Sequence, residues 1–344
     1  MKALILKEYN KFELIDMVKP VVKRDDEVLL KVKACGICGS DVHGMDGSTG
    51  RRIPPIVMGH EASGIIEEVG SNVREWSKGD RVTFDSTIYC GKCHFCQRGQ
   101  INLCDNRRVA GVSCSDYRQH GAFAEYIVVP QHILYRLSEG ITFEQATMVE
   151  ALSIAFHAVR RTPITLNDTV VVVGAGMIGI LVIQSLRLAG CGNIIAVDID
   201  DRKLTNAKKL GADYGFNSSM ANVKEEVLKL TQNRGADCSF EVVGISPAVK
   251  TGIDVLRKGG SLTLVGNISA QIDFPLQAVV TREVTLYGSC SSNGEYPACL
   301  DMIVRKKIDV DSLISAVASL SEGASWFKRL YAKEPGLMKV ILTP

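Results

Sequence analysis

The chain has 344 residues, of which 46% are hydrophobic and 23% charged, a composition typical of a globular protein with about two domains. With 40 basic and 38 acidic residues the net charge is +2, which argues against a nucleic-acid-binding or membrane-surface protein. The N-terminus does not resemble a signal peptide, and no apolar run reaches the roughly 18 residues that a bilayer crossing needs. We therefore expect a cytoplasmic protein that contacts neither nucleic acid nor membrane.

The first 150 residues predict short strands separated by glycine and proline. Apolar or alternating runs at 28–33, 63–69 and 81–84 predict strands, and Gly79-Asp80 predicts a turn before the third. Short strands at this spacing are typical of a β-barrel or a sandwich-like unit.

From about 165 to 288 the pattern changes to strands that alternate with helices. We expect strands at 170–173, 194–197, 213–216, 237–243, 261–265 and 284–287, and helices at 177–188, 202–210 and 221–231. This alternation predicts a doubly wound α/β unit with a parallel sheet. A helix at 296–304 and a strand at 338–341 are expected near the end of the chain.

A glycine-rich turn follows the first of these strands and opens a helix. Gly174, Gly176 and Gly179 form the spacing G-x-G-x-x-G, and Ile178 lies inside it. In this context the first glycine permits the turn, the second lets the backbone approach a pyrophosphate, and the third lets helix and strand pack closely. The next strand ends at Asp198, whose carboxylate suits a ribose diol and would repel a 2′-phosphate, so the sequence favours NAD over NADP.

Other residues of the same unit are candidates for contact with the cofactor. Ligands of doubly wound sheets bind at the carboxyl ends of the strands, where Val243, Val265-Gly266 and Ser289 lie. Lys203 could reach the adenosine or could be a solvated helix charge. An alternative for each of the strand-end positions is an ordinary strand-to-loop residue.

The chain contains 11 cysteines, many for a protein without a secretory signal, so clustered cysteines indicate metal or catalysis rather than disulfides. Cys38, His60 and Glu61 offer a thiolate, an imidazole and a carboxylate, three ligand types that zinc accepts. Three protein ligands leave one position open, as a catalytic zinc requires. Cys35 and Cys38 could be read as a redox pair, but no thioredoxin-like pattern accompanies them.

A second group of cysteines has the spacing C-x2-C-x2-C-x7-C, formed by Cys90, Cys93, Cys96 and Cys104. Four thiolates satisfy the tetrahedral coordination of structural zinc. The alternative of a nucleic-acid finger lacks a basic surface and a second ligand pair at finger spacing.

These motifs, in this order, resemble the zinc-dependent medium-chain alcohol and polyol dehydrogenases over essentially the whole chain. The resemblance rests on Gly59-His60-Glu61 with Gly64, Gly70 and Val73, on the four-cysteine spacing, on residues 121–126, and on residues 148–153. It implies a GroES-like β-barrel catalytic domain at 1–155 and 290–344 and a Rossmann domain at 156–289. It also implies NAD and two zinc ions per chain, one catalytic and one structural.

The resemblance assigns roles to individual residues. Cys38, His60 and Glu61 would hold the catalytic zinc, and Glu150 would bind it directly, through a water, or only during turnover. Ser40 would supply the hydroxyl of a proton relay, which His43 could continue toward solvent; His43 could equally be an ordinary surface residue. The four cysteines would hold the structural zinc.

The implied reaction is hydride transfer between a secondary alcohol and NAD, with zinc lowering the pKa of the substrate hydroxyl and Ser40 passing its proton outward. Glu150 and the segment 38–43 resemble the sorbitol, galactitol-phosphate and threonine dehydrogenase branch, so we expect a polyol or related sugar as substrate. Threonine, a vicinal diol such as butanediol, and a non-catalytic NAD-binding redox sensor remain alternatives. Arg51 and Arg52 could meet a substrate phosphate, although two adjacent loop arginines are usually solvated. A homotetramer or homodimer joined near 284–287 is also implied.

Overall fold

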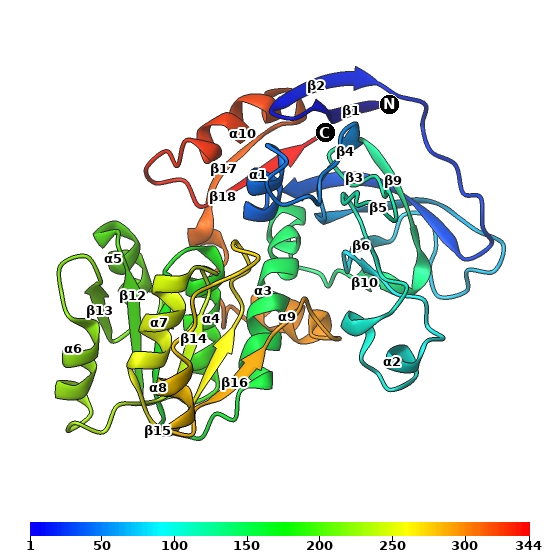
Figure 1. The fold of residues 1–344 in the computed structure, drawn as a ribbon. Helices are drawn as coiled ribbons and strands as arrows, with labels where there is room; N and C mark the ends of the chain where they lie inside the picture. The colour runs from blue at the N-terminus through cyan, green and yellow to red at the C-terminus, as the bar shows by residue number, and fades with distance from the viewer. The chain divides into compact units, whose positions relative to one another are not determined.

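The computed structural model describes residues 1–344, which form two compact units, Met1–Glu150 with Tyr296–Pro344 and Ala151–Glu295. Figure 1 traces the chain through both units. No helix combines the length and the apolar composition that a membrane crossing requires.

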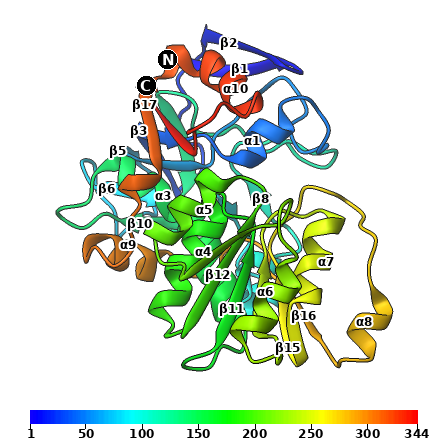
Figure 2. The same ribbon diagram turned by 90° about the vertical axis from the view of Figure 1, so that its left-hand side faces the viewer.

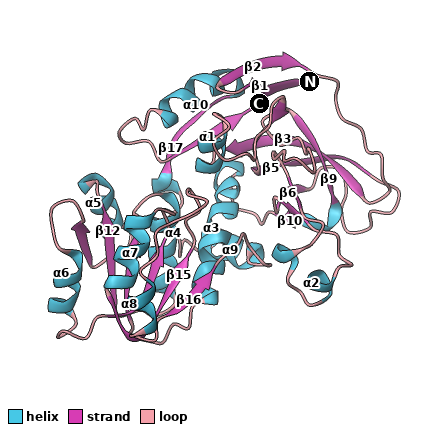
Figure 3. Ribbon diagram, viewed as in Figure 1, coloured by secondary structure: helices cyan, strands magenta, loops and turns pink.

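The first unit is built mainly from strands, as the sequence predicted (Figure 3). One sheet has the order β10-β6-β5-β3-β18-β17, with β9 paired to β3, and a smaller sheet has the order β2-β1-β4. The last strand, β18, lies beside β3 and so brings the end of the chain next to residues 35 and 36. The strands are β1 (Lys2–Glu8), β2 (Lys11–Asp16), β3 (Glu27–Gly36), β4 (Ile56–Val57), β5 (Glu61–Val69), β6 (Arg81–Phe84), β7 (Thr87–Ile88), β8 (Arg108–Val109), β9 (Tyr126–Pro130), β10 (Leu134–Arg136), β17 (Ile314–Ser319) and β18 (Lys339–Thr343).

The helices around these sheets are short, apart from one that leads into the second unit. They are α1 (Gly39–Gly44), α2 (His94–Gln97), α3 (Phe143–Arg161), α9 (Tyr296–Val304) and α10 (Gly323–Tyr331). A single apolar core joins the sheets and contains, among others, Leu4, Leu30, Ile66, Phe123 and Phe327. The first hairpin, α3 and α10 were not predicted from the sequence.

The second unit is a parallel sheet with the order β13-β12-β11-β14-β15-β16 (Figure 2). Helices α6 and α7 pack on one face of it, where Val223, Val227 and Ala248 meet Val171 and Ile195. The predicted doubly wound architecture is therefore present. The elements are β11 (Thr169–Val173), α4 (Met177–Leu188), β12 (Asn193–Asp198), α5 (Asp201–Lys209), β13 (Tyr214–Asn217), α6 (Val223–Leu230), β14 (Ala236–Glu241), α7 (Ser246–Asp254), β15 (Leu256–Leu264), α8 (Leu276–Val280) and β16 (Thr285–Gly288).

Candidate metal and cofactor sites

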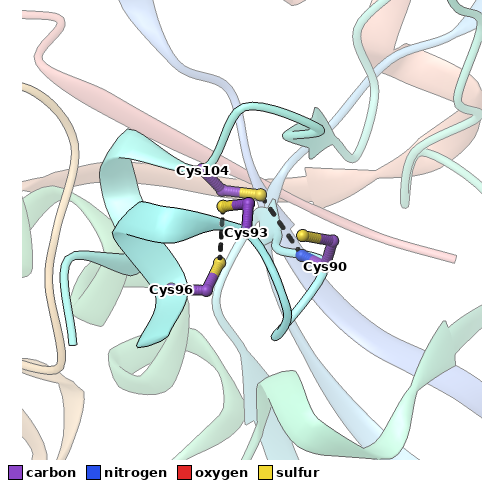
Figure 4. A group of neighbouring side chains, drawn as sticks. All are labelled: Cys90, Cys93, Cys96 and Cys104. Atoms are coloured by element: carbon purple, nitrogen blue, oxygen red, sulfur yellow. Dashed lines mark hydrogen bonds between the residues drawn. The ribbon is translucent and has the colours of Figure 1, made fainter. Parts of the chain in front are cut away.

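The four cysteines of the second cluster converge around α2 in the first unit. Figure 4 shows their side chains gathered together, and the four sulfur atoms lie within 4.8 Å of one another. The Sγ atoms of Cys93 and Cys96 are 3.5 Å apart, and the backbone N–H of Cys90 donates to Cys104 Sγ at 3.3 Å. Four sulfurs at this mutual distance suit tetrahedral zinc, which supports the predicted structural site.

The thiols of this cluster differ in acidity. Backbone N–H groups of Lys92 and Cys93 lower the pKa of Cys90 to about 6, so this sulfur is available as a thiolate near neutral pH. Burial and the neighbouring Cys93 raise the pKa of Cys96 to about 12. Zinc binding must therefore displace protons from part of the cluster, which makes its affinity depend on pH.

Cys38, His60 and Glu61 come from two neighbouring segments of the first unit. Cys38 is the N-cap of α1 and lies two residues after the end of β3, while Glu61 is the first residue of β5 and His60 precedes it. Because Gly36 of β3 pairs with Glu61 of β5, the antiparallel register brings the three side chains together. Their ligand atoms lie within 4.8 Å of one another, and His60 and Glu61 are buried.

Only one of the two carboxylate oxygens of Glu61 has a hydrogen-bond partner in the protein. Lys339 Nζ donates to Glu61 Oε2 at 2.5 Å, and a side chain at Gly36 would come within 2.3 Å of the same oxygen. The other oxygen, Oε1, is buried without a hydrogen-bond partner. A buried carboxylate oxygen without a partner is costly unless a ligand satisfies it, so these residues fit a bound metal ion.

His60 has a carboxylate behind its ring. Its Nδ1 lies 3.5 Å from Asp41 Oδ2, and the backbone N–H of Cys38 lies 3.4 Å from the same oxygen. Burial alone would lower the pKa of His60, but the charges of Asp41 and Cys38 hold it well above its usual value. A metal-binding histidine commonly has such a carboxylate behind its second nitrogen, where it fixes the tautomer and the ring orientation.

Glu150, on α3, lies near this group but outside the set of ligand atoms that fall within 4.8 Å. Burial and the charge of Glu61 raise the pKa of Glu150 to about 7, although His60 and Lys339 oppose the shift. A carboxyl group that titrates near neutrality can serve as an occasional metal ligand or as a proton acceptor.

Ser40 and His43 lie on α1, which follows Cys38, and both residues are exposed. Ser40 Oγ accepts a hydrogen bond from Arg52 Nη2 at 3.3 Å. The carbonyl oxygen of His43 accepts from Ser48 Oγ at 2.9 Å, so the helix and the loop after it are tied together.

In the second unit the glycine-rich turn lies between β11 and α4. Gly174 has a φ of +104°, which favours glycine, and a side chain at Gly179 would come within 1.9 Å of the Gly174 carbonyl oxygen. A side chain at Gly176 would meet nothing within 4 Å. The chain itself therefore does not require glycine at Gly176, whereas the close approach of a pyrophosphate does.

Asp198 ends β12 and faces this turn. Its Oδ2 accepts from the backbone N–H of Ala175 at 2.8 Å, and its Oδ1 accepts from the N–H of Ile199 at 2.8 Å. Lys203 Nζ lies 3.9 Å from Oδ1. Ile178, in the first turn of α4, is partly buried. The carboxylate thus ties its own loop to the glycine-rich turn as well as offering an acceptor for a ribose.

The remaining cofactor candidates lie where β14, β15 and β16 end. These strands are parallel and adjacent. Val243, Val265-Gly266 and Ser289 therefore lie at the carboxyl-terminal ends of the strands, as the glycine-rich turn does. A side chain at Gly266 would come within 2.1 Å of the Gly244 nitrogen, so the two loops touch. Ser289 Oγ is buried without a hydrogen-bond partner in the protein, so it is available to hydrogen-bond to a bound ligand.

Sequence reasoning did not identify the charged residues that support these sites. Asp41 lies between Ser40 and His43 in the motif, but only the folded chain shows its contact with His60. Lys339 is 278 positions away from Glu61 and has the sequence context of an ordinary strand lysine. Glu241, whose Oε1 accepts from the N–H groups of Val243 and Gly244 at 2.7 Å, similarly fixes a cofactor-side loop.

Comparison with known proteins identifies the family of the chain. Residues 24–139 match the alcohol dehydrogenase GroES-like domain, and residues 178–305 match the zinc-binding dehydrogenase domain. The sorbitol dehydrogenase of Halalkalibacterium halodurans is 35% identical over 351 residues, which span 100% of this chain and 99% of that protein.

Solved structures of similar proteins also match the whole chain, and two of them contain a bound nicotinamide cofactor. A zinc-binding dehydrogenase from Sinorhizobium meliloti 1021 bound to NADP has a TM-score of 0.89 at 29% identity, with 99% of its chain covered. An alcohol dehydrogenase from Escherichia coli CFT073 complexed with NADH has a TM-score of 0.90 at 28% identity, again with 99% covered. The predicted fold class and family are confirmed, and the chain belongs to the zinc-binding dehydrogenases of the medium-chain alcohol and polyol dehydrogenase family.

Proposed function

We propose that the protein transfers hydride between a secondary hydroxyl group of a polyol or related sugar and NAD. The observation that carries this proposal is the cluster of Cys38, His60 and Glu61, whose ligand atoms lie within 4.8 Å of one another. One thiolate, one imidazole and one carboxylate leave a zinc ion with an open position for a substrate oxygen. The similarity to a sorbitol dehydrogenase over the whole chain supports a polyol as the substrate.

When bound, zinc supplies Lewis-acid polarisation of the substrate hydroxyl, and the nicotinamide accepts or returns the hydride. The protein's own residues handle the proton. Ser40 is exposed beside the ligand Cys38, so its Oγ is placed to accept the proton of the substrate hydroxyl as it gives up its own proton, and the exposed His43 on the same helix can pass that proton to water. Glu150, with a pKa raised to about 7 chiefly by burial, is a second proton acceptor on the buried side.

Asp198 favours NAD over NADP in this proposal. One oxygen of its carboxylate accepts a hydrogen bond from the N–H of Ala175 in the glycine-rich turn, and the carboxylate can still accept hydrogen bonds from a ribose diol. Its negative charge would repel a 2′-phosphate. Lys203, at 3.9 Å from Asp198, offsets part of that charge. The relative with bound NADP makes this preference a matter for direct measurement.

The protein is proposed to act as a homodimer or homotetramer in the cytoplasm. Strand β16 is the edge of the parallel sheet, and an unpaired edge is a natural surface for pairing between copies. Leu286 on this strand and Leu276 and Val280 on α8 are exposed apolar side chains of the same region. Light scattering on the purified protein gives the number of copies.

Initial rates test the proposal. NAD and NADP are compared across sugar alcohols, their phosphates, threonine and butanediol, with zinc content measured on the same sample. The proposal expects NAD reduction with a polyol and about two zinc ions per chain. Turnover of threonine or butanediol alone would redirect the substrate assignment, and tight NAD binding with no turnover of any alcohol would favour a non-catalytic role.

A further inference from the structure

Arg52 is not the solvated loop arginine that its sequence context suggests. Its side chain is 4% exposed, and its guanidinium donates to Asp41 Oδ1 through Nε at 3.1 Å and Nη2 at 2.8 Å. Nη1 donates to the carbonyl oxygen of Arg51 at 3.0 Å. Nη2 also contacts Ser40 Oγ at 3.3 Å. The guanidinium is therefore fixed between a carboxylate, a hydroxyl and the backbone.

Asp41 also contacts two of the metal ligands, His60 and Cys38. The carboxylate is completely buried, and the oxygen that Arg52 leaves free, Oδ2, faces His60 Nδ1 at 3.5 Å and the Cys38 N–H at 3.4 Å. One carboxylate thus joins the arginine to both His60 and Cys38.

The loss of Arg52 would leave the Asp41 carboxylate buried without its cation. A buried charge without a partner is strongly unfavourable, so the carboxylate would move away from its present position. His60 would then lose the carboxylate that lies 3.5 Å from its Nδ1, and the Cys38 N–H would lose its acceptor. The residues behind metal ligands typically change metal affinity about 10- to 100-fold when they are removed.

The chain also leaves room for this arginine. A side chain at Gly44, near the end of α1, would come within 2.6 Å of Arg52 Cγ and 3.3 Å of Thr49 Oγ1. A glycine at this position lets the stem of Arg52 lie against the helix that carries Ser40 and Asp41. The adjacent Arg51 is exposed and supplies only its backbone carbonyl to the arrangement, so it makes a matched control.

We propose that Arg52 is a positioning residue of the catalytic metal site: it holds Asp41 against His60 and Cys38, and it fixes Ser40 Oγ directly. The inference rests on the proposed function, because the ion it concerns is the catalytic zinc. Arg52 acts through other residues and need not touch substrate or cofactor.

The test is the release of zinc to a chromogenic chelator from the full-length protein as purified. With two zinc sites, we expect two kinetic phases of zinc release. The phase that is missing in Cys38→Ser is assigned to the catalytic site, and the remaining phase is assigned to the four-cysteine site. Arg52→Met should release catalytic zinc about 10- to 100-fold faster than Arg51→Met, while the four-cysteine phase stays unchanged. Arg52→Lys keeps the charge without the forked geometry, so its release should be intermediate.

The proposal would be overturned if Arg52→Met released the catalytic zinc at the same rate as Arg51→Met. If Arg52→Met does not fold, Arg52→Lys decides: faster release supports the proposal, and wild-type release overturns it. A positioning role also predicts that kcat with the best alcohol falls more than KM rises in Arg52→Lys. Failure of the proposed function is a different result, because the wild-type protein itself would then lack the catalytic phase or turn over no alcohol.

Discussion

The ammonium group of Lys339 lies 2.5 Å from Glu61 Oε2, and the two side chains are 3% and 1% exposed. Burial alone would lower the pKa of Lys339, but the charge of Glu61 keeps it above its usual value. The last strand of the chain therefore supplies a cation that holds one oxygen of Glu61 while Oε1 remains free for a metal.

Removal of this cation should destabilise the first unit and weaken its metal site. Lys339→Met leaves Glu61 buried without a partner, which typically costs about 3–5 kcal/mol in the free energy of unfolding. Urea unfolding measures the loss. Lys307→Met, at an exposed position, is the control and should change the free energy of unfolding by no more than about 0.5 kcal/mol. Equal losses in the two variants would show that the pair does not support the site.

The two predicted zinc sites should separate by mutation. Cys38→Ser should lose one zinc ion and all turnover while its thermal unfolding stays close to that of the wild type. Cys93→Ser should lose the other ion and unfold at a lower temperature, because zinc holds together a loop with few apolar residues of its own. Metal analysis and calorimetry of both variants check this. Loss of turnover without loss of metal in Cys38→Ser would contradict the assigned roles.

Two glycines of the cofactor turn should respond differently to alanine. Gly176→Ala meets nothing in the chain, so the NAD-free protein should keep its unfolding temperature while NADH binds more weakly, which fluorescence titration measures. Gly179→Ala would come within 1.9 Å of the Gly174 carbonyl and should destabilise the unit even without cofactor. Unchanged NADH affinity in Gly176→Ala would argue against a pyrophosphate at this turn.

Asp237, on β14, should make stability depend on acid pH. Burial raises its pKa, but hydrogen bonds from Arg234, Arg257 and the Thr169 N–H outweigh this and lower it to about 2. Since the unfolded value is about 3.9, the stabilisation is fully present well above pH 4 and is lost as the pH falls toward 2.

Asp237→Asn should therefore cost about 2 kcal/mol at pH 7, and its difference from the wild type should shrink as the pH falls from about 5 to about 2. Thermal unfolding across this range measures the difference. Asp273→Asn, at an exposed position, is the control and should change the free energy of unfolding at pH 7 by no more than about 0.5 kcal/mol. A constant difference between Asp237→Asn and wild type would contradict the assignment.

The sequence predicted those parts of the fold that local patterns determine. The β-branched run at 170–173 and the glycines after it identified β11 and the turn, and the register of β3 with β5 then explains why Cys38 and Glu61 meet. Boundaries differed by a residue or two, as for α5, expected at 202–210 and observed at Asp201–Lys209. Helix ends depend on capping contacts such as that of Asp200 with the Arg202 N–H, which hydrophobic periodicity does not reveal.

The residues that the sequence did not identify are those whose roles depend on long-range contacts. Arg52 and Lys339 are charged, and charged residues are usually exposed, so nothing in the sequence indicates that either is buried. They are buried because each meets a carboxylate from another segment, Asp41 and Glu61. Such pairs become visible only when the three-dimensional arrangement of the strands is known.

Anomalous diffraction at the zinc absorption edge, on crystals of the protein as purified, tests the central claim most directly. We predict one peak bonded to Cys38 Sγ, His60 and a Glu61 oxygen at about 2.0–2.3 Å, and a second among the four cysteines. A peak at the four cysteines alone, with none at Cys38, His60 and Glu61 in an enzyme that still oxidises a polyol, would contradict the account.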